Sequence, residues 1–232
     1  MLSRNKKKIY IIGVNSSDFF DCTLESIKKI NKVDCIVISK GFNTRFINIL
    51  KENGKKLILE EDLSKNKNEE LWKKIKNLFK DYSLIAHIKQ SDPYLFDEAI
   101  DEKKFFEKNG LETEIILGII EEIDWLNQGE KLLTDRKKNS SVIFAKKFNR
   151  TKINRMLLNL DFEKLVIRFA EKSDLLTFFG ILSNLSNKIN LACNIIENGK
   201  IKLVTPKIIE NFYRKNQLKN SVIIVVEKDE KI

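Results

Sequence analysis

The sequence contains few of the residues from which metal sites, disulfide frameworks and catalytic triads are built. His87 is the single histidine among 232 residues, which excludes a site with two histidine ligands and argues against a Ser-His-Asp triad. We expect this histidine to lie packed or hydrogen-bonded within a strand over residues 83–89. Cys22, Cys35 and Cys193 lack the paired spacing of a zinc site or a disulfide framework, and we expect them to be buried small hydrophobic residues in a reducing compartment.

Long apolar runs are also absent. No run approaches the ~18 residues needed to span a bilayer, and residues 1–13 pass from a basic stub into a strand-like run that is too short for a secretory signal. We therefore expect a cytoplasmic protein without a membrane segment. The composition, 42% hydrophobic and 33% charged, is typical of a globular chain. A length of 232 residues allows one large domain or two small ones.

The formal net charge of +10 favours anionic partners, either nucleic acid or a small molecule with several carboxylates. The chain lacks the interleaved aromatic and basic residues of the usual nucleic-acid-binding modules, so we expect the small molecule rather than nucleic acid. Basic residues are spread widely, and many of them are equally explained as solvated helix surface. The densest basic stretch, which is either a ligand-binding patch or such a surface, consists of Arg136, Lys137, Lys138, Lys146, Lys147, Arg150, Lys152 and Arg155.

Strand-like runs alternate with amphipathic helices over residues 1–120. Apolar runs predict strands over residues 8–13, 33–39, 55–61, 83–89 and 113–119. Apolar residues at helical spacing predict helices over residues 24–30, 46–54, 68–82 and 99–110. The alternation implies parallel pairing with right-handed crossovers, and hence a doubly wound α/β domain.

The pattern changes at a polar helical connection over residues 119–140, and we place a second α/β domain at residues 121–232. Its predicted strands cover residues 141–147, 175–180, 189–196, 200–205 and 221–228, and its predicted helices cover residues 161–172, 181–189 and 207–216. Only a few residues separate the strands at 189–196 and 200–205, which forces this pair to run antiparallel. The second sheet is therefore predicted to be mixed.

Three loops follow predicted strands of the first domain, at the edge where open parallel sheets bind ligands. They are Gly13–Asp18, Lys89–Pro93 and Leu117–Glu121. None carries the glycine spacing of a dinucleotide fingerprint or of a phosphate-binding loop. Taken singly, each loop is more simply an ordinary turn.

Taken together, the loops and their neighbours have a characteristic order. Gly13, Asp18, Thr23 and Leu24 follow the first strand, and Lys89–Phe96 reads Lys-Gln-Ser-Asp-Pro-Tyr-Leu-Phe. Further matching segments are Val33–Val37, Phe178–Gly180 as a strand end, and the closing run over residues 221–227. In order and spacing these segments resemble the tetrapyrrole methylases across nearly the whole chain, and most closely the uroporphyrinogen-III C-methyltransferase branch of that family.

The resemblance implies a homodimer in which a cleft between the two domains holds S-adenosylmethionine, with a tetrapyrrole substrate above it. The methyl group would pass to a ring carbon. The basic stretch around Arg150 would pair with carboxylates of the macrocycle. By the same analogy the cofactor contacts would be Gly13, Ser16, Gln90, Ser91, Asp92, Leu95, Ile120, Glu121, Phe179 and Ala192.

The chain also departs from the family pattern at these loops. Gln90 and Ser91 stand where the family has two glycines, and Asn15–Ser17 stand where it has Gly-Pro-Gly. Where the branch carries an aspartate after the second strand and a lysine after the third, this chain has Ser39, followed by Lys40, and Asp62. Those family residues are thought to move protons, so no catalytic residue is assigned from the sequence. The alternative to a methyltransferase is a protein that keeps the fold and binds ligand without turnover.

Overall fold

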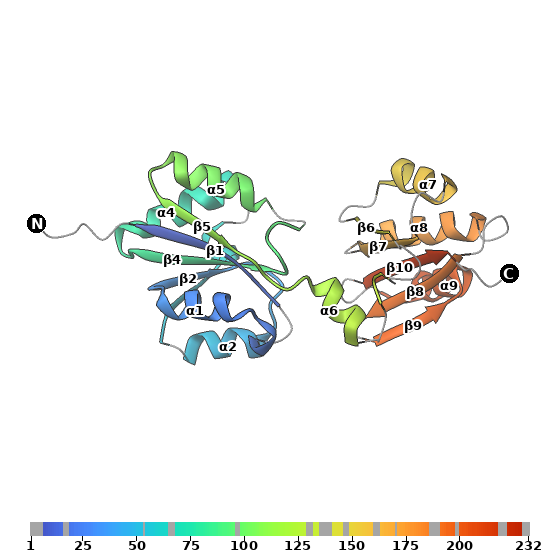
Figure 1. Ribbon diagram of the computed structural model, residues 1–232, viewed down its shortest axis with the longest axis horizontal. Coiled ribbons are helices and arrows are strands. Elements are labelled where there is room, and N and C mark those ends of the chain that lie inside the picture. The colour runs from blue at the N-terminus through green and yellow to red at the C-terminus, as the bar shows by residue number, and fades with distance from the viewer. Residues whose placement is uncertain are drawn as a thin grey trace, which may run out of the picture. The chain divides into compact units, whose positions relative to one another are not determined.

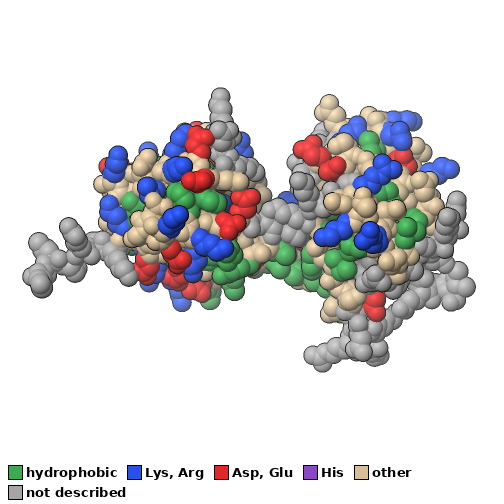
Figure 2. All heavy atoms as spheres, turned by 90° about the horizontal axis from the view of Figure 1, so that it is seen from above, with side chains coloured by type: hydrophobic (Ala, Val, Ile, Leu, Met, Phe, Trp, Pro, Cys, Tyr) green, Lys and Arg blue, Asp and Glu red, His purple; other side chains and the backbone are tan. Residues whose placement is uncertain are grey.

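The computed structural model describes residues 7–15, 19–52, 54–64, 68–95, 98–128, 132–134, 141–145, 149–159, 163–169, 171–185, 191–197, 200–217 and 222–228. The chain divides into two compact units, Met1–Glu121 and Glu122–Ile232. Each unit contains a five-stranded sheet and its own hydrophobic core (Figure 1). On the face that Figure 2 shows, Lys and Arg side chains are scattered over both units among Asp and Glu side chains.

The sheet of the first unit is entirely parallel. Its strands are β1 (Lys8–Val14), β2 (Cys35–Ile38), β3 (Lys56–Leu59), β4 (Leu84–Gln90) and β5 (Glu112–Ile116), in the order β3-β2-β4-β1-β5. In the central register, Ile12 lies beside Ile88 of β4 and Ile116 of β5. Strands β1, β2 and β4 are almost wholly buried, as a parallel sheet covered on both faces requires.

Helices cover both faces of this sheet (Figure 1). The elements are η1 (Phe19–Asp21), α1 (Leu24–Lys32), α2 (Thr44–Glu52), α3 (Glu60–Leu63), α4 (Glu69–Asn77), η2 (Leu78–Lys80) and α5 (Ala99–Lys108). Ile30 of α1 and Phe46 of α2 pack on one face, whereas Trp72 of α4 and Phe106 of α5 pack on the other. The predicted doubly wound domain is therefore confirmed, as are buried positions for all three cysteines of the chain.

The second unit has a mixed sheet. Its elements are α6 (Glu121–Gln128), β6 (Val142–Ala145), α7 (Arg150–Asn159), β7 (Lys164–Phe169), α8 (Lys172–Leu185), β8 (Leu191–Glu197), β9 (Lys200–Val204), α9 (Pro206–Lys215) and β10 (Val222–Lys228). The strand order is β6-β7-β10-β8-β9, in which β6 and β7 are parallel and the other neighbours are antiparallel. The predicted antiparallel pairing of β8 with β9 is confirmed.

Two elements predicted for the second unit are wrong. The predicted helix over residues 161–172 is strand β7, and the predicted strand over residues 175–180 lies inside helix α8. Helix α8 is apolar on most of its sides, so its leucines and phenylalanines resemble a buried strand when read over a short window. Gly180 suggested a strand end, but it lies within the helix, with no atom within 4 Å of where a Cβ would be. Helix α7 was not predicted, because only Ile153 and Leu157 mark its buried side.

Candidate functional site

Three loops of the first unit cross at the carboxyl edge of its sheet. A Cβ on Gly13 would lie 2.5 Å from the carbonyl oxygen of Ser91 and 2.5 Å from Cδ of Pro93. A Cβ on Gly118 would lie 2.3 Å from the same Ser91 oxygen. Since the opposing atoms belong to backbone or to a proline ring, only glycine fits at these two positions. The absence of side chains at Gly13 and Gly118 therefore serves the contact between loops.

Hydrogen bonds fix this crossing. The Ser91 N–H donates to the carbonyl oxygen of Val14 at 2.8 Å. The Asp92 carboxylate accepts from the Tyr94 N–H at 2.8 Å and from the Gly118 N–H at 3.1 Å. Asp92 is buried, and its two oxygens tie the loop after β4 to the loop after β5. Its direct role is to hold the loops together.

Ser91 has a backbone conformation that normally favours glycine. Its φ of 63° lies in the left-handed region, where a side chain costs roughly 1 kcal/mol. The family resembled by the sequence has glycine at this position. In this chain a serine adopts the backbone conformation that normally favours glycine.

The first turn of α1 is joined to the same crossing. Thr23 caps the helix, and its Oγ1 accepts from the Ser26 N–H at 3.1 Å. The Ser26 hydroxyl is placed 3.0 Å from the carbonyl oxygen of Gly13 and 3.3 Å from that of Leu117. Ser26 was not among the predicted site residues. The signal for it is a serine three positions after a threonine N-cap, on the helix that follows the first strand.

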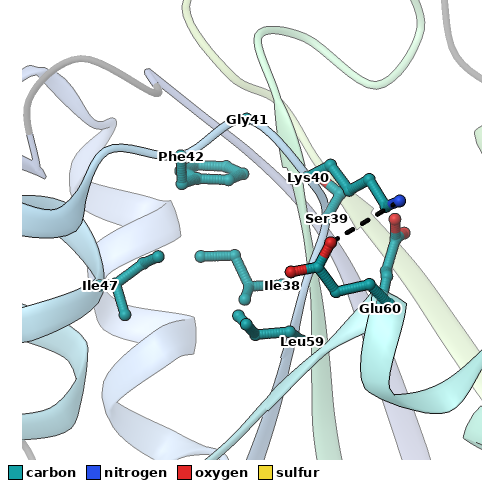
Figure 3. Close-up of a pocket in the computed structure, with 9 residues that line it drawn as sticks. Ile38, Ser39, Lys40, Gly41, Phe42, Ile47, Leu59 and Glu60 are labelled. Atoms are coloured by element: carbon teal, nitrogen blue, oxygen red, sulfur yellow. Dashed lines mark ion pairs between the residues drawn. The ribbon is translucent and has the colours of Figure 1, made fainter.

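A pocket of about 140 Å³ opens at the ends of β2 and β3. It is lined by Ile38, Ser39, Lys40, Gly41, Phe42, Ile47, Leu59, Glu60 and Glu61. Figure 3 shows the apolar side chains facing one another, with Lys40 and Glu60 to one side of them. Lys40 Nζ lies 3.6 Å from a Glu61 oxygen in an exposed ion pair.

The pocket and the loop crossing are neighbours at the same sheet edge. Gly41 has a φ of 93°, and a Cβ there would lie 2.4 Å from Nε2 of Gln90. The Gln90 side chain at the end of β4 therefore rests against the loop after β2. Ser39 and Lys40, which the sequence aligned with the aspartate of the resembled branch, line the pocket together with Glu60 and Glu61, whereas Asp62 does not. The sequence placed both glutamates at a strand end, whereas they begin helix α3.

Glu60 also belongs to a buried network of charged side chains on the α5 side of β4. His87 Nε2 lies 2.7 Å from Glu60 Oε1, and His87 Nδ1 lies 2.5 Å from Glu102 Oε1. Lys89 Nζ lies 3.2 Å from Glu102 Oε2 and 3.7 Å from Glu60 Oε1. His87 and Glu102 are 0% exposed. The prediction that His87 is a hydrogen-bonded strand residue is confirmed, although its partners were not predicted.

These contacts set the charges of the network. Burial by itself would raise the pKa of Glu60, but the hydrogen bond and charge of His87, with the charge of Lys89, lower this pKa. Burial would lower the pKa of His87, yet the charge of Glu102 and hydrogen bonds to both glutamates raise it, against the opposing charge of Lys89. Burial also opposes ionisation of Glu102, but the charges of His87 and Lys89 bring its pKa to about 2. These contacts favour the ionised carboxylates of Glu60 and Glu102 and the protonated form of His87.

The structure brings together only some of the predicted cofactor contacts. Gly13, Ser91 and Asp92 meet at the crossing, Gln90 borders it, and Leu95 donates its N–H to the Asp92 carbonyl oxygen at 3.0 Å. Ile120 is half-buried just before α6, and Glu121 begins that helix. Ser16 and the side chain of Glu121 lie outside the described residues.

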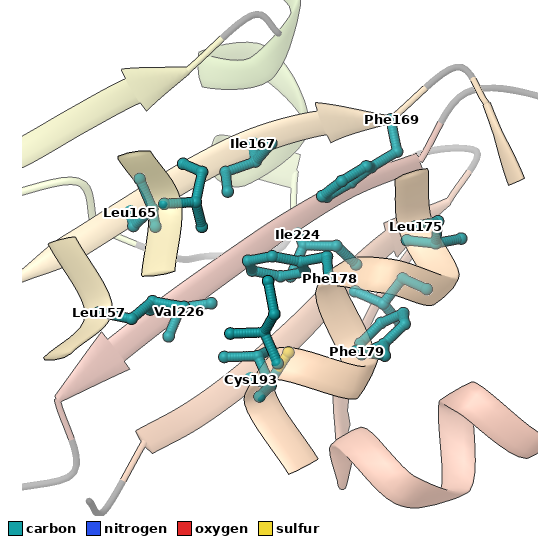
Figure 4. Packing of buried hydrophobic residues seen from close by; sticks show 14 of the residues in the cluster. Leu157, Leu165, Ile167, Phe169, Leu175, Phe178, Phe179, Cys193, Ile224 and Val226 are labelled. Carbon is teal, nitrogen blue, oxygen red and sulfur yellow. The ribbon is translucent and has the colours of Figure 1, made fainter. Parts of the chain in front are cut away.

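The predicted contacts of the second unit lie in different surroundings. Phe179 is 0% exposed and packs beside Phe178 in the core between α8 and the sheet (Figure 4), not at a strand end. Ala192 is half-buried in β8. Of the basic stretch, Arg150, Lys152 and Arg155 are exposed on α7, and the other members lie outside the described residues.

Within the described ranges, no group of His, Cys, Asp and Glu side chains has the arrangement of a metal site. The described helices include none that is both long enough and apolar enough to cross a bilayer.

Comparison with known proteins gives relatives in sequence and in fold. No protein-family profile matches the chain. A uroporphyrinogen-III C-methyltransferase of Bacillus subtilis (strain 168) is 25% identical over 140 residues, which are 60% of this chain and 54% of the relative. The match thus spans about half the length of that relative.

Solved structures match nearly the whole chain. A cobalt precorrin-4 methyltransferase superposes with a TM-score of 0.75 at 16% identity, covering 95% of this chain and 94% of that one. A uroporphyrin-III C-methyltransferase from Thermus thermophilus, complexed with S-adenosyl homocysteine, superposes with a TM-score of 0.73 at 13% identity. The superposition covers 95% of this chain and 97% of that one. A diphthine synthase superposes with a TM-score of 0.68 at 13% identity, covering 96% of this chain and 90% of that one. The chain therefore has the fold of these methyltransferases and is similar in sequence, over 140 residues, to a uroporphyrinogen-III C-methyltransferase.

Proposed function

We propose that the chain is an S-adenosylmethionine-dependent methyltransferase that acts on a carbon of a tetrapyrrole such as uroporphyrinogen III. The observation that carries the proposal is the crossing of Gly13, Ser91 and Gly118 at the carboxyl edge of a parallel sheet. Open α/β sheets bind their ligands at this edge. The sequence relative and the neighbour complexed with S-adenosyl homocysteine support the same assignment.

The residues at the crossing fit a cofactor that is held mainly by backbone groups. The Asp92 carboxylate is already engaged by two N–H groups of the chain, so the cofactor would be held by backbone of residues 90–95 and 117–120. Leu117 and Tyr94 are 57% and 56% exposed, and they offer apolar surface to a nucleoside. The bound cofactor would supply an electrophilic methyl group on its sulfonium.

The remaining parts of the proposal concern substrate and assembly. The exposed Arg150, Lys152 and Arg155 would pair with carboxylates of the macrocycle. We assign the active form to a homodimer, which predicts a light-scattering mass near twice the 27.1 kDa of the chain.

Calorimetric titration with S-adenosylmethionine and S-adenosylhomocysteine tests cofactor binding. Leu117→Asp should weaken binding at least about tenfold, because a charge replaces exposed apolar surface worth about 1.5 kcal/mol when covered. Ile100→Asp is the matched control, since Ile100 is 43% exposed on α5, and it should leave affinity unchanged. No detectable binding at millimolar ligand would refute the proposal. Where binding occurs, incubation with uroporphyrinogen III should increase its mass by one or two methyl groups.

A second candidate is a binding protein with the same fold and no turnover. The observation that favours it is that Gln90 and Ser91 fill positions where the resembled family has glycine, and that Gln90 rests against Gly41. Cofactor binding without methylation of uroporphyrinogen III would support this candidate. The fold alone does not identify the substrate, because a diphthine synthase has the same fold.

A further inference from the structure

Glu60 connects the pocket to the buried charges. It is the one lining residue of the pocket that hydrogen-bonds His87, through an Oε1–Nε2 distance of 2.7 Å. Its side chain is 10% exposed, whereas that of its neighbour Glu61 is 54% exposed. A carboxylate in this position is shielded from water yet borders a space that a ligand can enter.

We propose that Glu60 is the proton acceptor of this pocket, and that His87, held by Glu102, is the positioning residue that keeps Glu60 ionised and correctly oriented. This inference rests on the proposed methyltransferase function. It assigns to this chain's own residues a task for which the sequence offered no candidate.

The reaction requires such an acceptor. Methyl transfer to a ring carbon forms one C–C bond and breaks one S–C bond, whose electron pair stays on sulfur. The ring gains one positive charge and regains neutrality by losing one proton. The Glu60 carboxylate takes up that proton and becomes a neutral acid, and the proton leaves to solvent when the pocket opens.

The surroundings of Glu60 suit this step. A cationic ring is a strong acid, so the acceptor does not need high basicity but must be ionised throughout the working pH range. Lys89 of β4 lies near the carboxylates of both Glu60 and Glu102, and His87 donates a hydrogen bond to Glu60 when it is protonated. At the rim, Lys40 is paired with Glu61, and Glu60 is one of the residues that line the pocket.

The geometry also separates the roles of the two histidine nitrogens. In the imidazolium, Nδ1–H donates to Glu102 and Nε2–H donates to Glu60. Removing Glu102 removes the charge that stabilises the imidazolium, so His87 would become neutral at a lower pH. Glu60 would then lose its cationic partner while remaining buried, and protonation of Glu60 would begin at a higher pH.

The first test needs neither cofactor nor substrate. Because His87 is the only histidine, one set of imidazole signals appears in a long-range ¹H–¹⁵N NMR spectrum of the full chain. Both nitrogens should be protonated below the titration midpoint, which should lie above the ordinary 6.5. Glu102→Gln should shift that midpoint downward, whereas Glu107→Gln, an exposed change on the same helix, should leave it in place. A neutral His87 at pH 6 in the wild type would overturn the inference.

The second test measures turnover. Glu60→Gln should reduce kcat by about 100-fold or more, as expected for loss of a general base, while the Kd for S-adenosylmethionine stays within about twofold. Glu60→Asp should recover part of kcat, which also guards against a folding defect in the glutamine variant. His87→Gln should move the acid limb of the kcat–pH profile upward, a change that a purely structural role would not produce.

The outcomes separate this inference from the function on which it rests. Equal turnover by the wild type and Glu60→Gln overturns the role of Glu60 and leaves the methyltransferase assignment standing. No methyl transfer by the wild type overturns the assignment and, with it, the role of Glu60, whatever the state of His87.

Discussion

The loop crossing and the buried charged network lie next to each other along strand β4 and are built on opposite principles. The crossing is made of backbone, and it exists because Gly13 and Gly118 have no side chain. The network is made of side chains, and it exists because the charges of His87 and Lys89 balance those of two glutamates. Added volume should therefore damage the first region, and altered charge should damage the second.

The largest effect is expected from breaking the charge balance. Glu102→Ala removes the buried carboxylate that faces both His87 and Lys89, and we expect it to lower the free energy of unfolding by about 4 kcal/mol. Glu107→Ala on the same helix removes only an exposed pair with Lys103, and it should change stability by less than about 0.5 kcal/mol. Urea unfolding can be followed by the fluorescence of buried Trp72 in a background with Trp125→Phe. Equal effects of the two changes would show that the network is not a source of stability.

Adding a single carbon should disrupt the crossing. Gly118→Ala would place a Cβ 2.3 Å from the Ser91 carbonyl oxygen and 2.7 Å from the Gly13 carbonyl carbon. Both are backbone atoms, so the loops themselves would have to move apart. We expect a loss of about 2–3 kcal/mol. Gly180→Ala is the control, because a Cβ within α8 would meet no atom within 4 Å, and it should gain about 0.5–1 kcal/mol. A stable Gly118→Ala variant would mean that the loops approach less closely than described.

The two regions also differ in how far the sequence could predict them. Gly13, Ser91 and Asp92 were identified because each follows a strand, and the carboxyl ends of parallel strands meet at one edge. The network was missed because its members are separated along the chain, with Glu60 27 residues from His87 and Glu102 15 residues from it. In sequence, both glutamates look like the solvated acidic residues that surround them. Only the packing of α3 and α5 against β4 shows that they are buried.

The units differ in a similar way. In the first unit, every strand contains a short apolar run whose length suits a strand and not a helix. In the second unit, β7 and α8 are both strongly apolar. The spacing of their apolar residues alone therefore led to a helix being predicted for β7 and a strand for part of α8. Phe179 was consequently placed at a strand end, whereas it is a core residue of α8. Ile153 and Leu157 were too few to indicate α7.

Raising the pH should weaken the network and spare the crossing. The pKa of His87 is raised above the ordinary 6.5, so its stabilising effect is complete below pH 6.5 and is lost as pH rises through the folded-state value. The pKa values of Glu60 and Glu102 are lowered from 4.5, so their contribution is lost only as pH falls through the folded-state values. We expect the network to stabilise most between about pH 4.5 and 6.5 and to lose stabilisation as the pH rises above that range. Urea midpoints from pH 5 to 9 should fall in the wild type and stay level in His87→Gln.

The smallest expected effect concerns the backbone of Ser91. Ser91→Gly removes the strain of a left-handed residue at φ 63°, but it also gives the unfolded chain more freedom, so the net gain should be about 0.5 kcal/mol. Asn68→Gly is the matched control, since Asn68 has a φ of 75° and asparagine tolerates this region better than serine. It should gain less than Ser91→Gly, or lose slightly. Because Ser91→Gly also restores the glycine of the resembled family, a parallel rise in S-adenosylmethionine affinity would link the strain at this loop to cofactor binding. A gain in stability without a change in affinity would assign the serine to loop packing alone.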